Sequence, residues 1–450
     1  MIHKFKFENS NIVMDIHSGS IHILDDIAYE IVDDLPILSK HAIIEKYKEI
    51  FSEKEIEEAI EELTELKDHE MLYTKDSYEQ FVPAFLEREP VVKALCLHVA
   101  HDCNLACKYC FAGEGEYHGE RGMMSLEVGK KAVDFIIENS KHRNNIEIDF
   151  FGGEPLMNFE VVKGVVEYAR LREKETGKHF RFTMTTNGVL LNDEIIEYLN
   201  ENMYNVVLSL DGRPEVNDLM RPTPNGKGSY EIILPKFKKL VEKRKGKQYY
   251  VRGTYTHHNL DFAEDVKHIT EAGFKEVSIE PVVAPTSMHY ALQEADVERI
   301  CSEYEVLAKH MLNLARSGES FNFFHFMINL EDGPCVHKRL AGCGAGTEYL
   351  AVTPNGDLYP CHQFVGLPEF KMGHVADGVT ALDLRAKFEK CNVYSKDACK
   401  KCWAKLHCSG GCAANSYNFH GDIHAVYDIG CDLQKKRLEC AIGMRAEQLI

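Results

Sequence analysis

Between residues 94 and 317 the chain alternates strand-like and helix-like segments six times, and this alternation constrains the fold more than any other feature. Short apolar runs typical of buried strands occur at residues 94–99, 146–151, 180–185, 206–210, 249–255 and 277–283. Amphipathic stretches at helical spacing occur at residues 126–138, 161–172, 232–243, 262–272 and 296–315. Repeated strand–helix units predict an α/β fold with a parallel sheet, and six of them suit a partial (β/α)6 TIM-type barrel.

Three cysteines follow the first predicted strand with the spacing C-x3-C-x2-C: Cys103, Cys107 and Cys110. Each can bind one iron of a [4Fe–4S] cluster, and no fourth cysteine closes the local loop. Electron-transfer clusters normally have four cysteine ligands, so a cluster with one open iron indicates chemistry at the metal. Active sites of such barrels lie at the carboxyl ends of the strands, where this motif falls. Buried thiols and a zinc knuckle completed by His98 or His101 are the alternatives.

Polar and glycine residues follow the next strands of the predicted barrel. Gly152-Gly153-Glu154 comes after the second strand, Asn187 after the third, and Ser209 and Arg221 at or beyond the fourth. Glycines let the backbone approach a ligand closely, and a carboxylate suits an ammonium group. Ordinary tight turns, strand-end caps and a surface arginine are the alternatives. Glu280, which ends the sixth strand, is either a pocket residue or a solvated strand end.

Charge and length exclude several classes of protein. The chain has 450 residues, enough for two to four domains, and a formal net charge of −19 from 52 Lys+Arg and 71 Asp+Glu. This balance argues against a nucleic-acid partner. The amino terminus has no apolar signal segment, and no run is long enough to span a bilayer. We therefore expect a cytoplasmic protein with no membrane partner, in which cysteines bind metal rather than form disulfides.

Ten of the fifteen cysteines lie between Cys335 and Cys440, which predicts a separate metal-rich region. Its motif runs Cys343-x12-Gly356-x4-Cys361, then Cys399-x2-Cys402-x5-Cys408-x3-Cys412, with Cys431 after it. A zinc ribbon uses paired C-x2-C knuckles, and this region holds one such pair. We expect four further cysteines to be structural thiols: Cys96, Cys301, Cys391 and Cys440. His362 and His407, beside cluster cysteines, either tune the potential or are ordinary surface histidines.

Residues 1–75 follow a winged-helix-like pattern. Strands are expected at residues 2–7, 12–16 and 21–24, helices at 43–51 and 56–66, and a possible returning strand at 71–73. Ser52 and Glu55 have the spacing of a capping box. A winged helix suggests DNA binding, but eight Lys, no Arg and eighteen Asp+Glu give a net charge of about −10, a poor match to a polyanion.

Together these features resemble the radical S-adenosylmethionine (SAM) peptide maturases with a SPASM domain, and most closely the thioether-forming (sactipeptide or ranthipeptide) maturases of SCIFF-type six-cysteine precursor peptides. The resemblance implies a leader-recognition element at residues 1–80, a radical SAM barrel at 90–317 and a SPASM domain at 318–450. In that reading the leader peptide adds as a strand to the small sheet; a plain packing subdomain is the alternative.

The resemblance also implies cofactors and their ligands. Cys103, Cys107 and Cys110 would hold the catalytic cluster, and SAM would be bound by Phe111, Gly152, Gly153, Glu154, Asn187, Ser209 and Arg221. Two auxiliary [4Fe–4S] clusters would make three in all. Cluster I would use Cys343, Cys361 and Cys412, with Cys335 either closing it or leaving an open iron for a substrate thiolate. Cluster II would use Cys399, Cys402, Cys408 and Cys431.

The implied reaction begins with reductive cleavage of SAM to a 5′-deoxyadenosyl radical, which abstracts hydrogen from a cysteine-rich precursor peptide before a C–S bond forms. A flavodoxin- or ferredoxin-type protein would supply electrons. Three alternatives stay open: an oxidase resembling anaerobic sulfatase maturases, a non-enzymatic Fe–S electron carrier, and a zinc-stabilised scaffold. The sequence leaves open the precursor, the carbon that receives sulfur and the oligomeric state.

Overall fold

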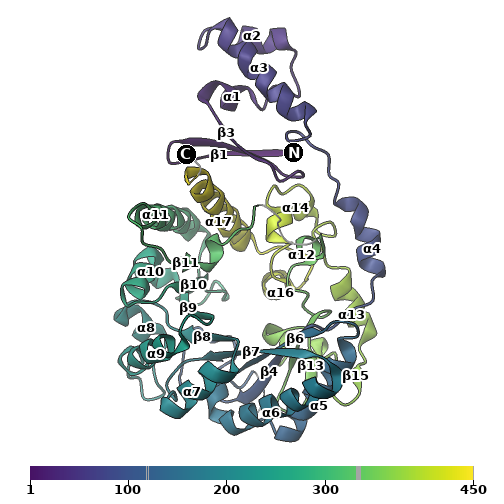
Figure 1. The fold of residues 1–450 in the computed structure, drawn as a ribbon, viewed down its shortest axis with the longest axis vertical. Helices are drawn as coiled ribbons and strands as arrows, with labels where there is room; N and C mark the ends of the chain where they lie inside the picture. The colour runs from purple at the N-terminus through teal and green to yellow at the C-terminus, as the bar shows by residue number, and fades with distance from the viewer. Residues whose placement is uncertain (118, 120, 331–335, 449–450) are drawn as a thin grey trace.

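The computed structural model describes residues 1–450 except 118, 120, 331–335, 449 and 450 (Figure 1). A curved sheet with helices on its outer side occupies the lower part of the view. A small amino-terminal module lies above it, and the last helix runs from that module towards the centre of the molecule. Cys335 lies outside the described residues, so its predicted role stays a prediction.

Six parallel strands form the centre of the sheet in chain order, and each predicted strand overlaps one of them. They are β4 (Ala94–His101), β6 (Asn145–Gly152), β7 (His179–Thr186), β8 (Asn205–Ser209), β9 (Tyr249–Tyr255) and β10 (Glu276–Pro281). The predicted α/β class with a partial barrel is therefore confirmed. Side chains alternate along the strands, so that Ile146, Ile148 and Phe150 of β6 are fully buried in the main core.

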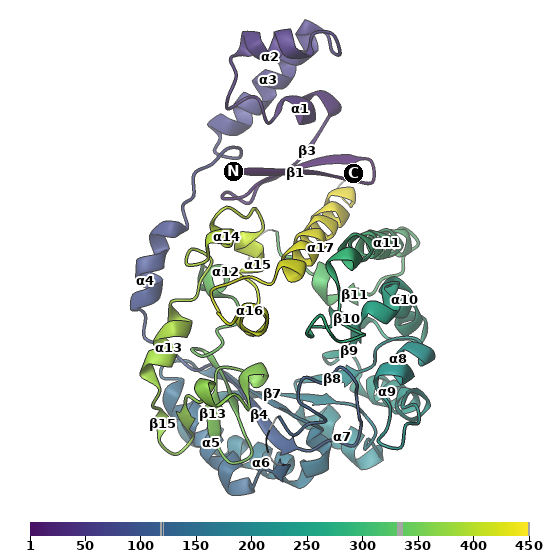
Figure 2. The same ribbon diagram turned by 180° about the vertical axis from the view of Figure 1, so that it is seen from behind.

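Helices cover the convex face of this sheet (Figure 2). They are α5 (Leu126–Asn139), α6 (Phe159–Thr176), α7 (Asp193–Asn202), α8 (Pro214–Met220), α9 (Tyr230–Arg244), α10 (Phe262–Glu271) and α11 (Val297–Arg316). Local capping defines several ends: the side chain of Ser125 accepts from the Val128 amide before α5, and that of Asn192 accepts from the Ile195 amide before α7. The carboxyl ends of the strands are left facing the concave side.

The sheet continues beyond the six strands at both edges, which the sequence did not predict. At one edge, the short β11 (Asn322–Phe323) pairs in parallel with β10. At the other edge β12 (Tyr349–Val352) pairs in parallel with β4 and is followed by β13 (Asp357–Tyr359), β14 (Gly373–His374) and β15 (Gly378–Val379). Glu348, just before β12, ion-pairs with Arg88 and with Lys93 at 2.6 Å. These pairs fix the cysteine-rich region to the start of β4.

The rest of the cysteine-rich region has short helices and one long one. They are α12 (Val336–Ala341), α13 (Leu382–Glu389), α14 (Asp397–Lys400), α15 (Lys405–Cys408), α16 (Ala413–His420) and α17 (Asp428–Glu447). Helix α17 packs on α11 and on the amino-terminal strands. At Gly443 a Cβ atom would lie 2.3 Å from the ring of Phe7, so a residue without a side chain is needed for this close contact.

The amino-terminal module is winged-helix-like, as predicted. Strands β1 (Ile2–Phe7), β2 (Ser10–Asp15) and β3 (Ile21–Leu24) form an antiparallel sheet in that order, so β3 is an edge strand. Helices α1 (Asp26–Ile31), α2 (Lys40–Tyr47) and α3 (Glu53–Asp68) follow, and Ser52 and Glu55 form the predicted capping box. The possible strand at 71–73 was wrong, because these residues form bends after α3; helix α4 (Val82–Glu87) then leads to β4.

Within the described part of the chain, no helix combines the length and apolar character that crossing a membrane requires.

Candidate functional site

A cavity of about 150 Å³ at the carboxyl ends of the strands brings together all the residues predicted for the catalytic cluster and SAM. Its lining includes Cys103, Cys107, Cys110, Phe111, Gly152, Gly153, Glu154, Asn187, Ser209 and Arg221. These residues come from β4, β6, β7 and β8 and the loops after them, as expected for parallel strands that end at one rim. What the cavity binds stays a prediction at this point.

The cysteine loop after β4 is held in place by α8. The amide of Ala106 donates to the carbonyl of Pro222 at 2.8 Å, and that of Lys108 donates to the carbonyl of Met220 at 2.9 Å. The Asn187 side chain donates to the side-chain oxygen Oδ1 of Asn104 at 2.8 Å, and its nitrogen lies 3.7 Å from the sulfur of Cys103. The loop is therefore anchored on two sides, which orders the sulfur atoms before any metal binds.

Gly152 and Gly153 let the loop after β6 lie directly against the end of β4. A Cβ at Gly152 would be 2.2 Å from the carbonyl oxygen of Ala100, and one at Gly153 would be 2.1 Å from that of Asp102. Gly152 also has a φ of 121°, a conformation that side chains rarely adopt. Because neither glycine has a side chain, the backbone after β6 can lie against the backbone at the end of β4. Glu154, the next residue, is thereby placed beside the cysteine loop.

Glu154 is 1% exposed and is oriented by three hydrogen bonds. It accepts from the Leu156 amide at 3.0 Å, the Thr186 hydroxyl at 2.8 Å and the Asn187 amide at 2.8 Å. A carboxylate has about four acceptor positions, so one stays free for a donor in the cavity. Burial raises the pKa of Glu154, while these donors oppose the shift. This arrangement suits an ammonium ligand.

Arg221 reaches the cavity from the end of α8 and is 9% exposed. Its Nη1 donates to the Tyr109 hydroxyl at 2.8 Å, and Tyr109 in turn donates to Asp211 at 2.8 Å. The Nε of Arg221 is buried and has no hydrogen-bond partner in the described structure. Because a buried unpaired donor is costly, this atom points to an anionic or carbonyl group of a ligand. The sequence did not predict that Tyr109 bridges Arg221 and Asp211; it showed only that Tyr109 lies within the cysteine motif.

Cys103 and Cys107, which are both partly buried, have the chemistry of metal ligands rather than reactive thiols. Burial, with Glu154 adding to it, raises the pKa of Cys103 to about 12, and burial raises that of Cys107 to about 11. Such thiols stay neutral at physiological pH unless a metal supplies positive charge, and a coordinated thiol is deprotonated outright. The cavity with its three cysteines therefore fits an iron–sulfur cluster.

Seven cysteines of the carboxyl-terminal region are the predicted ligands of two further clusters. Burial raises the pKa of Cys361, and the charges of Cys412 and Cys343 add to the shift. A separate cavity of about 360 Å³ is lined by Cys399, Cys402, Cys408 and Cys431. Burial raises the pKa of Cys399 and of Cys431 to about 11. The division of these cysteines into a set of three and a set of four stays a prediction.

The zinc alternatives lack support in the geometry. Among the described residues, no three His, Cys, Asp or Glu side chains converge closely enough to hold a single metal ion. A [4Fe–4S] cluster places each thiolate on a different iron and so separates its ligands more widely. The Nδ1 of His98 instead lies 3.1 Å from the Nε2 of His101, and both rings pack against Tyr117.

Of the four predicted structural thiols, Cys96 and Cys440 are buried and Cys301 is partly buried. Cys391 donates to the Ile423 carbonyl at 3.4 Å and lines the cavity that contains Cys343.

His407 is partly buried, and burial lowers its pKa to about 4. It is therefore neutral at physiological pH.

A second cavity of about 360 Å³ lies between the end of β10 and the cysteine-rich region, and Glu280 lines it together with Arg252 and Arg437. His325 is 3.1 Å from Glu280, and the interactions of Glu280 with His325 and Arg252 outweigh its burial and hold its pKa below the usual range. Glu280 is thus a pocket residue rather than a solvated strand end. Arg252 and Arg437 were missed, since only the fold brings β9 and α17 together. Cys408, Cys412 and Cys431 line the same cavity.

Two family models match the chain: a 4Fe-4S single cluster domain over residues 92–234, and SPASM, an iron-sulfur cluster-binding domain, over residues 343–403. An uncharacterized protein, MJ0907 of Methanocaldococcus jannaschii, is 30% identical over 61% of this chain and 87% of its own length. The radical SAM cyclopropyl synthase TigE of Paramaledivibacter caminithermalis is 23% identical over 78% of this chain and 74% of its own. The chain belongs to the radical SAM/SPASM-domain family.

Other members of the radical SAM/SPASM-domain family are similar over most of the chain. The serine-type anaerobic sulfatase-maturating enzyme of Bacteroides thetaiotaomicron is 25% identical over 71% of this chain and 82% of its own. The solved structure of anSMEcpe with bound AdoMet superposes with a TM-score of 0.68 at 22% identity, covering 80% of this chain and 96% of that one. Streptococcus suis SuiB bound to its precursor peptide SuiA gives 0.54 at 17% identity, covering 95% and 98%. These two likenesses concern the fold.

Proposed function

We propose that this protein is a radical SAM enzyme that installs cysteine thioether crosslinks in a ribosomally made precursor peptide, with SAM and three [4Fe–4S] clusters as cofactors. The observation that carries the proposal is the amino-terminal sheet, whose strand β3 pairs with β2 alone among the described strands and leaves one edge free. An extended peptide can add to such an edge through main-chain hydrogen bonds.

The shares of the chain that two solved structures cover support a peptide-binding role for the amino-terminal module. The anSMEcpe structure covers 80% of the chain and the SuiB structure 95%, a difference of about the size of that module. Ile23 on β3 is 41% exposed and is therefore accessible to a partner. The net charge of about −10 in residues 1–75 favours a leader peptide rich in Lys and Arg.

When bound, SAM and the cluster at Cys103, Cys107 and Cys110 supply a 5′-deoxyadenosyl radical. The protein's own part is to hold and position the reactants. Glu154 offers its free acceptor position to the SAM ammonium, and the unpartnered Nε of Arg221 suits the SAM carboxylate. The cavity at Glu280 and Arg252, bordered by Cys412, gives the peptide a place between the barrel and the auxiliary cysteines.

In this proposal Cys343, Cys361 and Cys412 would hold an auxiliary cluster with one open iron, which would supply a binding site for the substrate thiolate and an acceptor for the electron left after C–S bond formation. The proposal further places the enzyme in the cytoplasm, with a flavodoxin- or ferredoxin-type reductant.

The second candidate is an oxidase that acts on sulfatase-derived peptides. It is favoured by the extent of similarity to sulfatase-maturating enzymes, including the one from Bacteroides thetaiotaomicron that covers 71% of this chain. The two candidates share the barrel and cysteine sets, so the substrate must separate them.

The test is an anaerobic incubation of the iron-loaded protein with SAM, dithionite and either a cysteine-rich precursor peptide or a sulfatase-derived peptide. Loss of two hydrogens per crosslink from the precursor, with formation of 5′-deoxyadenosine, would support thioether formation. Oxidation of the sulfatase peptide with an unmodified precursor would overturn it in favour of the second candidate. Removing the leader from the precursor should abolish its modification, as should substitution Cys103→Ala.

Ile23→Glu tests the docking edge, with Ile37→Glu as its matched control, because Ile37 is 79% exposed but lies in the loop after α1. Precursor binding measured by fluorescence anisotropy should weaken only in the Ile23 variant. Equal binding by both variants would exclude β3 as the docking edge.

A further inference from the structure

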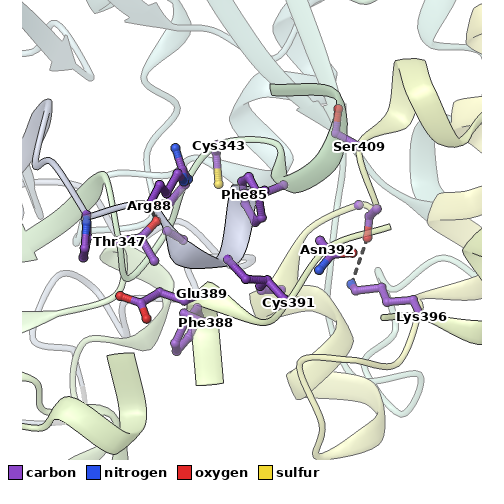
Figure 3. A pocket seen from close by; sticks show the side chains of 18 residues that line it. Phe85, Arg88, Cys343, Thr347, Phe388, Glu389, Cys391, Asn392, Lys396 and Ser409 are labelled. Carbon is purple, nitrogen blue, oxygen red and sulfur yellow. Dashed lines mark hydrogen bonds between the residues drawn. The ribbon is translucent and has the colours of Figure 1, made fainter. Parts of the chain in front are cut away.

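Lys396 is a buried cation in the cysteine-rich region, only 2% exposed. It immediately precedes α14, and its ammonium group donates to the carbonyl of Gly410 at 2.9 Å, shown as the dashed line in Figure 3. Gly410 lies midway along the loop from Cys408 to Cys412. The ammonium group is therefore attached to the segment that joins a predicted ligand of cluster II to a predicted ligand of cluster I.

No carboxylate of the described residues forms an ion pair with Lys396 within 4.0 Å. Asp422, an acidic residue whose charge reaches the neighbouring Cys391, is exposed and accepts from the His424 amide in its own loop. The nearby Lys405 is also buried, at 3% exposure, but it pairs with Asp76 at 2.6 Å. A buried cation without a counter-charge costs several kcal/mol. Lys396 therefore requires a negative group, which no carboxylate of the described residues supplies.

The sulfur atoms around Lys396 supply that charge once they are thiolates. Lys396 lies three residues before Cys399, and its hydrogen-bond acceptor Gly410 lies two residues before Cys412. The ammonium group is therefore held against segments that carry one predicted ligand of each cluster. Lys396 also lines the same cavity as Cys343 and Cys391 (Figure 3). Its printed partner, the Gly410 carbonyl, accounts for one of the three ammonium protons, so two stay available for a negative group.

We propose that Lys396 is the shared counter-cation of both auxiliary clusters and raises the reduction potential of each. This inference rests on the proposed presence of two auxiliary clusters. A cluster bound by thiolates carries net negative charge, which grows by one on reduction, so a fixed cation in a poorly solvated site stabilises the reduced form more than the oxidised form. Net charge and hydrogen bonding near the sulfurs are the main protein determinants of such potentials. Lys396 thus makes both clusters better acceptors of an electron from the peptide.

Three full-length variants separate charge from hydrogen bonding. Lys396→Gln keeps a donor for Gly410 but removes the charge, Lys396→Arg keeps the charge, and Lys401→Gln is the control, because Lys401 is close to Cys402 in sequence but exposed. The readout is a redox titration of each auxiliary cluster followed by electron paramagnetic resonance, with iron content measured on the same samples.

We expect Lys396→Gln to lower the one-electron reduction equilibrium constant of both clusters at least tenfold, which is about 59 mV. Lys396→Arg should stay near the wild-type potentials, and Lys401→Gln should not move them. Unchanged potentials in Lys396→Gln at full iron content would overturn the proposal, as would a shift in only one cluster. If Lys396→Gln loads no auxiliary iron while Lys396→Arg does, the charge requirement is supported; if neither loads, the proposal is overturned. About four irons in the wild type, instead of about twelve, would refute the proposed clusters themselves.

Discussion

The rings of Phe111 and His362 lie 5.6 Å apart, with their planes inclined by 56°. Phe111 directly follows Cys110 and His362 directly follows Cys361, so this contact joins the two cysteine sites through residues next to their predicted ligands. Phe151, at the end of β6, packs on the same histidine at 5.1 Å. The orientation of the auxiliary cysteines relative to the SAM cavity therefore depends on a small aromatic cluster.

Replacing His362 by Leu should uncouple radical formation from peptide modification. Aromatic pairs contribute about 0.5–1.5 kcal/mol beyond the area they bury, so losing this one should lower crosslinked product per 5′-deoxyadenosine by up to about tenfold. Iron content and deoxyadenosine formation without peptide should stay at wild-type levels. His420→Leu, an exposed position at the end of α16, is the control. An unchanged product ratio would show that the contact has no role in coupling.

Local sequence signals were sufficient for the barrel but not for its edges. Each of the six central strands has its own apolar run, and each predicted site residue follows a strand end, so their convergence on one rim could be predicted. The pairing of β12 with β4 could not, because it joins segments about 250 residues apart through register alone. The link from Arg221 through Tyr109 to Asp211 and the counter-charge role proposed for Lys396 depend on distant side chains for the same reason.

Arg221→Gln should weaken SAM binding by about 10- to 150-fold, since a charge-assisted hydrogen bond contributes about 1.5–3 kcal/mol. Tyr109→Phe should cause a smaller loss, because it leaves the guanidinium in place and removes only the hydroxyl that orients it. Arg181→Gln is a matched control on an exposed arginine at the opposite end of β7. Isothermal titration calorimetry with SAM on iron-loaded protein measures all three. Equal affinities for Arg221→Gln and wild type would remove Arg221 from the SAM site.

Lys405→Met should destabilise the junction between the linker after the amino-terminal module and the cysteine-rich region. Asp76 accepts from Lys405 at 2.6 Å and from the Tyr394 hydroxyl at 2.8 Å, and His17 lies 3.4 Å away. Removing the cation leaves Asp76 without its closest counter-charge, and breaking a buried pair costs about 3 kcal/mol.

The measurement for Lys405→Met is the melting temperature at neutral pH. The control is Lys400→Met, whose partner Asp397 is 96% exposed; exposed pairs contribute about 0–1 kcal/mol, so its melting temperature should hardly change. Equal melting temperatures for the two variants would show that the Asp76 junction contributes no more than a surface pair.

The gain in stability of Asp149→Asn over wild type should be larger at alkaline pH than at mildly acidic pH. Burial, with the charge of Glu147 adding to it and a hydrogen bond from Thr183 opposing it, raises the pKa of Asp149 from 3.8 to about 7. Between these values the folded protein binds the proton more strongly than the unfolded chain does. Stability is therefore lost as pH rises from about 4 to about 7 and then stays constant.

The asparagine cannot ionise, so its advantage over Asp149 should grow by about 2 kcal/mol between pH 5.5 and pH 8.5, since one pKa unit corresponds to about 1.4 kcal/mol. Melting temperatures of variant and wild type measured in parallel at pH 5.5, 7.0 and 8.5 give this difference directly. Asp377→Asn, in an exposed turn between β14 and β15, should show the same small offset at each pH. A constant offset for Asp149→Asn as well would mean that this carboxylate ionises in the folded protein as it does in the unfolded chain.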